Sequence, residues 1–216
     1  MDDLSPADTT ATYATINMTG IGALTNEFDR SELFGLIAPA TGANNVVITA
    51  AASQGSIAGG GESVNEADQT TGWGTAATNS APTDTASTVT VTSATNELVV
   101  DNVAGGDQTT QTATVGAGQT ERWDSSGVDL NGFAIGSTKA GAASVVMSWT
   151  LNNAAGWASV GVSIKEAAAG GGGAGGPVGY RNLLGVGMFV AANPVMRRRM
   201  MLAGLAGVVL RRLLRG

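Results

Sequence analysis

The chain has 216 residues, of which 13% are charged, and it contains neither cysteine nor histidine. It is long enough to bury a sizeable core, and its charged fraction is about half that of an ordinary soluble domain. The missing residue types exclude disulfides, thiolate nucleophiles, imidazole metal sites, and catalysis by Ser-His-Asp or Cys-His groups. We therefore predict a protein without enzymatic activity, of the Thr-, Ala- and Gly-rich type common among extracellular β-proteins.

The formal net charge of −6 is divided unevenly along the chain. All 17 acidic residues lie at or before Glu166, together with four basic residues, so this body carries −13. Arg181 and the six arginines that follow it give the remainder +7. An acidic body repels phosphates, so we do not expect the body to bind nucleic acid.

Short β-type runs separated by Gly, Asn, Asp, Ser and Pro clusters fill the body. SVVMSWTL alternates cleanly, with Val145, Met147, Trp149 and Leu151 on one face, and WASVGVSIK alternates again after the turn-like NNAAG. These two runs predict an antiparallel hairpin. The predicted strands are 12–18, 32–38, 45–51, 87–92, 97–103, 119–123, 133–138, 144–151 and 157–165, with weaker candidates at 23–28, 62–67 and 111–115.

Many short strands without helical alternation favour an all-β fold. We predict a two-sheet antiparallel sandwich, jelly-roll-like, with a closed barrel as the alternative. The chain divides into an N-terminal segment (1–11) that is disordered or truncated, a β-sandwich domain (12–167), a Gly-rich linker (168–177) and a basic amphipathic tail (178–216) that is predicted to be helical.

Several sequence segments, taken in chain order, together resemble one group of known modules. ELFGLIAPATGANNVVITA, GQTERWDSS and AGAASVVMSWTLNNAAGWASVGVSIKEA resemble a group of uncharacterised β-sandwich modules in bacterial and metagenomic secreted or surface proteins. That group usually has one or two further strands before the segment matching ATINMTGIGALTN, and MDDLSPADTT does not have the pattern of a signal peptide. A truncated reading frame would account for both departures. It would leave a sheet edge uncovered and open to self-association.

Carboxylates are the strongest candidate ligands left in the chain. Asp101 and Asp107 flank the loop-like DNVAGGDQ, and Asp124 and Asp129 lie around ERWDSSGVDL. Oxygen ligands on loops between strands are suited to calcium, so these four are candidates for a structural calcium site. No other cofactor is expected, and solvated turn carboxylates are the alternative interpretation.

Tryptophans are the other candidates, because exposed indoles can stack on sugars. Trp123, between Arg122 and Asp124, is the best binding candidate, although a packed rim tryptophan covered by Arg122 is the alternative. Trp157 lies on the face opposite the aliphatic row and is a candidate for exposure, whereas Trp149 is in phase with the core.

The tail alternates apolar blocks with arginines. The block 200–210 would span about 16 Å as a helix, which is too short for a bilayer core of about 30 Å. On a helix most of these arginines share one side, so the tail predicts a basic amphipathic segment that contacts an anionic membrane or an acidic protein face. Its arginines are Arg197, Arg198, Arg199, Arg211, Arg212 and Arg215. The change in composition would also arise if the frame ran into unrelated sequence.

The resulting expectation is a non-enzymatic extracellular or cell-surface module, structural or adhesive, in a surface or virion-associated protein. Its expected partners are glycans, other surface proteins, or a second copy through an uncovered sheet edge. The alternative function is a carbohydrate-binding, lectin-like module. A carboxylate-based glycan hydrolase is a further alternative.

Overall fold

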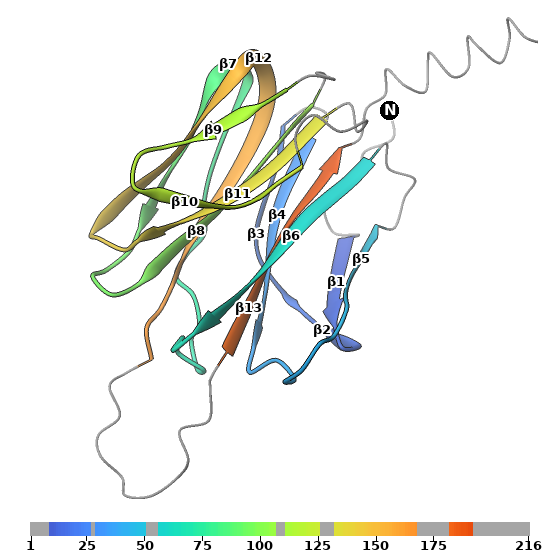
Figure 1. Cartoon of the computed structure of the whole chain (residues 1–216), viewed down its shortest axis with the longest axis vertical. Coiled ribbons are helices and arrows are strands. Elements are labelled where there is room, and N and C mark those ends of the chain that lie inside the picture. Colours follow the sequence, from blue (N-terminus) through green and yellow to red (C-terminus); the bar gives the residue numbers. More distant parts are fainter. Residues whose placement is uncertain are drawn as a thin grey trace, which may run out of the picture.

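The computed structural model describes residues 9–26, 29–50, 56–106, 111–125, 132–167 and 182–191, the last of these as backbone only (Figure 1). These residues form β-strands and no helix, and each strand pairing is antiparallel. The all-β prediction is confirmed. The strands are arranged in three sheets, where the sequence predicted two.

The largest sheet has the order β10-β11-β8-β12-β7, with the short β9 paired to β12. Its strands are β7 (Ala77–Thr92), β8 (Leu98–Gly106), β9 (Ala113–Val115), β10 (Gln119–Asp124), β11 (Gly132–Ala140) and β12 (Ser144–Ile164).

The 21-residue β12 bends so that its two halves lie in different layers (Figure 1). Its first half pairs with the end of β7, as in Met147 with Val89, and its second half pairs with both the start of β7 and β8. The predicted hairpin is therefore wrong, because NNAAG lies inside β12. The strand continues because β7 offers a partner to both halves, and the surplus residues between Thr150 and Trp157 are taken up as bulges.

The bend creates an outer ribbon, which we define as residues 86–92 of β7, residues 144–151 of β12, and β9. This ribbon packs on the middle layer, made of β10, β11, β8 and the second half of β12. Two apolar clusters fill the space between them, with Trp149 and Phe133 in one and Met147 and Val99 in the other. Burying these side chains is the main stabilising contribution here.

The second sheet has the order β3-β4-β13-β6 and covers the opposite face of the middle layer. Its strands are β3 (Thr19–Asn26), β4 (Asp29–Ile37), β6 (Ser56–Asn65) and β13 (Asn182–Ala191). Leu33 packs there against Val160 and Val162. In the middle layer, β8, β11 and the second half of β12 are consequently buried on both faces, so burial along them is nearly continuous instead of alternating. The edge strand β10 is largely exposed.

A small third sheet, β2-β1-β5, covers the outer face of β4. Its strands are β1 (Thr9–Tyr13), β2 (Ile16–Asn17) and β5 (Val46–Ala50). Ala11 and Met18 pack there on Phe34, which alternates along β4 with the inward-facing Leu33.

Strand β13 lies in the segment predicted to be a helical tail. For residues 182–191 that prediction is wrong, because this segment pairs along its length with β4 on one side and β6 on the other. The rest of the predicted linker and tail lies outside the described residues.

Candidate functional site: the Trp123 crevice

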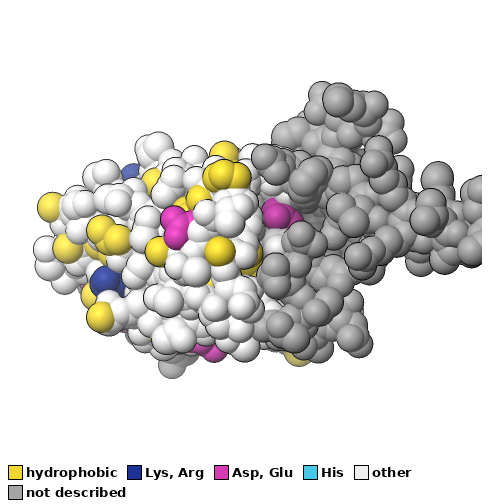
Figure 2. Space-filling view, turned by 90° about the horizontal axis from the view of Figure 1, so that it is seen from above, with side chains coloured by type: hydrophobic (Ala, Val, Ile, Leu, Met, Phe, Trp, Pro, Cys, Tyr) yellow, Lys and Arg dark blue, Asp and Glu magenta, His cyan; other side chains and the backbone are white. Residues whose placement is uncertain are grey.

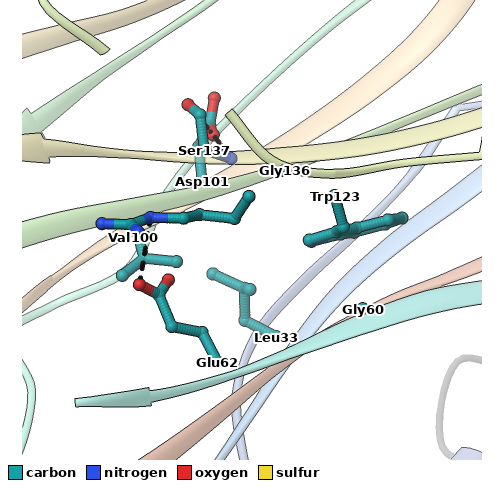
Figure 3. Close-up of a pocket in the computed structure, with 9 residues that line it drawn as sticks. Leu33, Gly60, Glu62, Val100, Asp101, Trp123, Gly136 and Ser137 are labelled. Atoms are coloured by element: carbon teal, nitrogen blue, oxygen red, sulfur yellow. Dashed lines mark hydrogen bonds and ion pairs between the residues drawn. The ribbon is translucent and has the colours of Figure 1, made fainter. Parts of the chain in front are cut away.

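Residues from two sheets, the large sheet and the second sheet, meet in a crevice beside Trp123 (Figure 3). We call it the Trp123 crevice. It lies where the edge strand β10 of the large sheet approaches the edge strand β6 of the second sheet. Its lining consists of Leu33, Gly60, Glu62, Val100, Asp101, Arg122, Trp123, Gly136 and Ser137.

A bulge in β10 brings two consecutive side chains into this crevice. The pairing of β10 with β11 shifts register between Glu121 and Trp123, so Arg122 is the extra residue. Because a bulge interrupts the alternation of side chains, Arg122 and Trp123 both line the crevice.

Two glycines hold the indole of Trp123. Figure 3 shows Trp123 between the positions of Gly136 and Gly60. A methyl group at Gly60 would lie 2.1 Å from Cγ of the indole, and one at Gly136 would lie 2.2 Å from its Nε1. The indole therefore lies directly against the backbones of β6 and β11. It is half-buried and, like Ala58, packs against the buried Ala104 and Ala134.

Arg122 connects the two sheet edges. Its Nε lies 3.1 Å from Oε1 of Glu62 on β6 and donates a hydrogen bond of 2.8 Å to Oγ1 of Thr138 on β11. Burial raises the pKa of Glu62, and the charge of Arg122 opposes that shift. With 42% of the Arg122 side chain exposed, this ion pair is a modest stabilising contact.

Asp101 lies on the crevice wall but faces the core under the outer ribbon. Its Oδ1 accepts hydrogen bonds from the backbone N–H and the hydroxyl of Ser137 at 2.9 and 2.7 Å, and its Oδ2 accepts one from Nε1 of Trp149 at 2.9 Å. Burial raises the pKa of Asp101 to about 6, and these hydrogen bonds act in the opposite direction. The carboxylate thus joins β8 and β11 to the outer ribbon.

The four carboxylates predicted for calcium are not gathered into one site by the described residues. Asp101 is buried in β8 with both oxygens hydrogen-bonded, whereas Asp124 ends β10 with its side chain exposed. Asp107 and Asp129 lie outside the described residues. Within the described ranges, no group of three or more acidic residues is placed to hold a metal ion.

Two further tryptophans, Trp149 and Trp157, are core residues. Trp149 is 1% exposed, as predicted, and Trp157 is 2% exposed. The expectation of an exposed Trp157 is wrong, because the second half of β12 lies in a layer covered on both faces, where neither side of the strand meets solvent.

These two indoles differ in hydrogen bonding, which leads to a test. Trp149 Nε1 donates to Asp101, whereas Trp157 Nε1 has no hydrogen-bond partner in the structure. We expect Trp149→Phe to lower the free energy of unfolding by about 1–2 kcal/mol more than Trp157→Phe, since only the first removes a donor from a buried carboxylate. Urea unfolding of both variants measures the difference, and equal losses would contradict the assigned hydrogen bond.

The arginines at 197–199, 211, 212 and 215 lie outside the described residues. Among the residues that are described, no helix has the length and apolarity needed to cross a membrane.

The crevice can therefore present one half-buried indole, one partly exposed guanidinium and the Glu62 carboxylate. Sequence reasoning identified Trp123 and Arg122 but missed Glu62, Gly60 and Gly136. The GGG run at 59–61 was the available signal, because adjacent glycines inside a strand indicate close approach of another group.

No protein-family profile, curated protein or solved structure matches this chain.

Proposed function

We propose that the protein is a non-enzymatic, extracellular structural or adhesion module of a surface or virion-associated protein. In this proposal the layers correspond to a jelly-roll-like β-sandwich. The proposal rests on one observation: several interior polar side chains form hydrogen bonds from one layer to the next, and these groups hold the layers together.

Three connections illustrate this use of polar groups. Asp101 joins the middle layer to the outer ribbon through Trp149. On the opposite face, the hydroxyl of Ser31 donates to the carbonyl of Asn102 at 2.9 Å, and the Asn102 amide donates back to that hydroxyl. Asn26 at the end of β3 donates to the carbonyls of Ala81 and Trp157. Buried polar groups satisfied in this way fix how the layers pack.

The surface supports the same proposal. Figure 2 shows a face with few charged side chains, on which apolar and uncharged polar groups are mixed. On the outer ribbon, Thr88, Thr90 and Thr92 alternate outward from β7 and are exposed, opposite Ser148, Val146 and Ser144. An exposed, hydroxyl-bearing sheet face suits contact with another surface better than enclosure of a substrate.

Carbohydrate binding is the second candidate, favoured by the half-buried Trp123 beside Arg122 and Glu62. A single indole whose ring lies against two glycine backbones offers limited area for stacking on a sugar. A glycan hydrolase would need two available carboxylates. Of the two in the crevice, Asp101 has both oxygens bonded within the protein, and Glu62 is paired with Arg122.

The tail arginines remain candidates for contact with an anionic membrane or with the acidic body. Of the four carboxylates predicted to bind calcium, Asp101 is occupied by Ser137 and Trp149, so a calcium site remains a prediction for Asp107, Asp124 and Asp129.

The proposal is tested by displaying the full chain on a non-adherent cell. We expect display to increase attachment to surfaces, equally for the parent chain and for Arg122→Ala, because the partly exposed Arg122 is in the crevice and not on the hydroxyl face. A broad glycan array should give no signal that depends on Arg122 or Trp123. Array binding lost in both Arg122→Ala and Trp123→Ala would favour the lectin-like alternative, and polysaccharide turnover abolished by Glu62→Gln would overturn the non-enzymatic proposal.

A further inference from the structure

Three polar side chains on neighbouring strands of the large sheet form a connected group beneath the outer ribbon. Asp101 on β8 stands opposite Ser137 on β11, and Gln119 reaches Ser137 from the next strand, β10. The Ser137 hydroxyl donates to Oδ1 of Asp101 at 2.7 Å (Figure 3), and Nε2 of Gln119 donates to the Ser137 oxygen at 2.8 Å. A hydroxyl therefore lies between a carboxylate and a carboxamide, within hydrogen-bond reach of both.

The carbonyl oxygen of the Gln119 side chain is held by β12. The backbone N–H of Ser148 donates to Oε1 of Gln119 at 2.7 Å, and the Ser148 hydroxyl lies 3.4 Å from the same oxygen. Because a backbone N–H can only donate, this contact identifies which end of the carboxamide is oxygen and directs Nε2 toward Ser137. Gly116 leaves room for the carbonyl, since a methyl group there would lie 2.8 Å from Oε1.

Together these contacts contain the parts that acyl transfer requires. Ser137 is a hydroxyl nucleophile beside a base, Asp101. Burial raises the pKa of Asp101 to about 6, which makes it a stronger base than an exposed carboxylate and leaves it largely ionised at neutral pH. The N–H of Ser148 is at the distance expected of a donor to a developing oxyanion. The carbonyl carbon of Gln119 is one bond from Nε2, and the soft terminal torsion of the side chain can turn it toward Ser137 Oγ.

We propose that Ser137 attacks the side-chain carbonyl of Gln119 and forms an ester cross-link between β11 and β10 of the same chain. Ser137 Oγ bonds to Cδ of Gln119 while its proton passes to Asp101. The negative charge that develops on Oε1 is stabilised by the N–H of Ser148. The Cδ–Nε2 bond then breaks, and Asp101 returns the proton to the nitrogen, which leaves as ammonia.

This reaction consumes no oxidant, reductant or water. The chain reacts once with itself and turns over no substrate. The inference therefore goes beyond the proposed function and does not depend on it, because the test below detects a covalent bond and not adhesion.

Trypsin gives a direct readout of the cross-link, because basic residues are scarce in the body. Cleavage after Arg30, Arg122 and Lys139 places Gln119 and Ser137 on separate peptides, 31–122 and 123–139. The purified full-length protein is incubated at neutral pH, unfolded, digested and analysed by mass spectrometry. We expect the two peptides to remain joined, with a mass lower than their sum by one ammonia molecule, and to separate in dilute alkali, which hydrolyses esters.

Four variants test the assigned roles. Ser137→Ala removes the nucleophile and Gln119→Glu removes the leaving group, so neither should give joined peptides. Asp101→Asn removes the base and should lower the rate of joining by at least about a hundredfold. Ser125→Ala is the matched control, because Ser125 lies in the same tryptic peptide as Ser137 but donates to the carbonyl of Ala134. Its peptides should join as in the parent.

Three outcomes would overturn the proposal. Parent protein that is folded by circular dichroism, yet whose two peptides separate completely after every incubation time, would show that Ser137 and Gln119 are only hydrogen-bonded. Joined peptides in Ser137→Ala, or joined peptides that have lost no ammonia, would show that a different pair is linked. An unchanged rate of joining in Asp101→Asn would show that Asp101 is not the base.

Discussion

Replacing Asp101 with asparagine should remove most of a pH-dependent increase in stability between neutral and mildly acidic pH. The carboxyl is buried and its pKa is raised from 3.8 to about 6, so between these values the folded protein holds a proton that the unfolded chain has lost. The stabilisation from this proton is complete below the unfolded pKa and is lost as pH rises through about 6. A shift of this size corresponds to about 3 kcal/mol.

Urea unfolding from about pH 7.5 to about pH 4 would measure this effect. By about pH 4 the parent free energy of unfolding should rise by about 2.5 kcal/mol more than that of Asp101→Asn, because Glu62 and Asp68 titrate in both proteins and cancel in the comparison. The asparagine amide would face the indole N–H of Trp149, which adds a pH-independent loss of about 1–2 kcal/mol. Parallel pH profiles for the two proteins would show that Asp101 does not titrate in this range.

Alanine at Gly60 or Gly136 should destabilise the protein by about 3 kcal/mol, because the added methyl would overlap the indole of Trp123. The methyl at Gly60 would lie 2.1 Å from Cγ and the methyl at Gly136 would lie 2.2 Å from Nε1. Neither backbone can withdraw easily, since Gly136 is paired within the large sheet and Gly60 within the second sheet. Thermal and urea unfolding would measure the loss.

A double variant distinguishes this overlap from a general cost of losing glycine. In a chain that already carries Trp123→Ala, the further change Gly60→Ala should cost at least 1 kcal/mol less than it does alone. Gly20→Ala is the matched control, because its methyl would lie 3.9 Å from Phe34, at ordinary contact distance, and should change stability by no more than about 0.5 kcal/mol. Additive losses for Gly60→Ala and Trp123→Ala would contradict the described seating of the indole.

Strand positions were predictable where alternation and turn residues agree. The runs around Val145 and Met147, and around Val160 and Val162, were found because local pattern alone identifies them. Their connection was misjudged, because Asn152 and Gly156 have turn character locally, whereas the pairing of both halves of β12 with β7 is set by residues more than 50 positions away. The residue pattern of a single sequence does not show which distant strands pair with each other.

Burial was predictable only for strands with one solvated face. Trp149 followed the rule of alternation, but Trp157 did not, since the second half of β12 has no solvated face. Asp101 was placed in the predicted strand 97–103 but was also interpreted as flanking a loop, because DNVAGG is rich in turn formers; β8 in fact continues through that stretch to Gly106. At the crevice, Trp123 and Arg122 were identifiable by residue type. Their partners on β6 required the packing of two sheets that the sequence does not specify directly.

The continuous β12 also affects how the protein unfolds. One continuous strand contributes to the outer ribbon and to the middle layer, so we expect the two layers to be coupled when the protein unfolds. The amide protons in both halves of β12 are then protected by the same opening reaction, and their exchange with solvent follows global unfolding. The two apolar compartments on either side of the middle layer therefore behave as a single cooperative unit during denaturation.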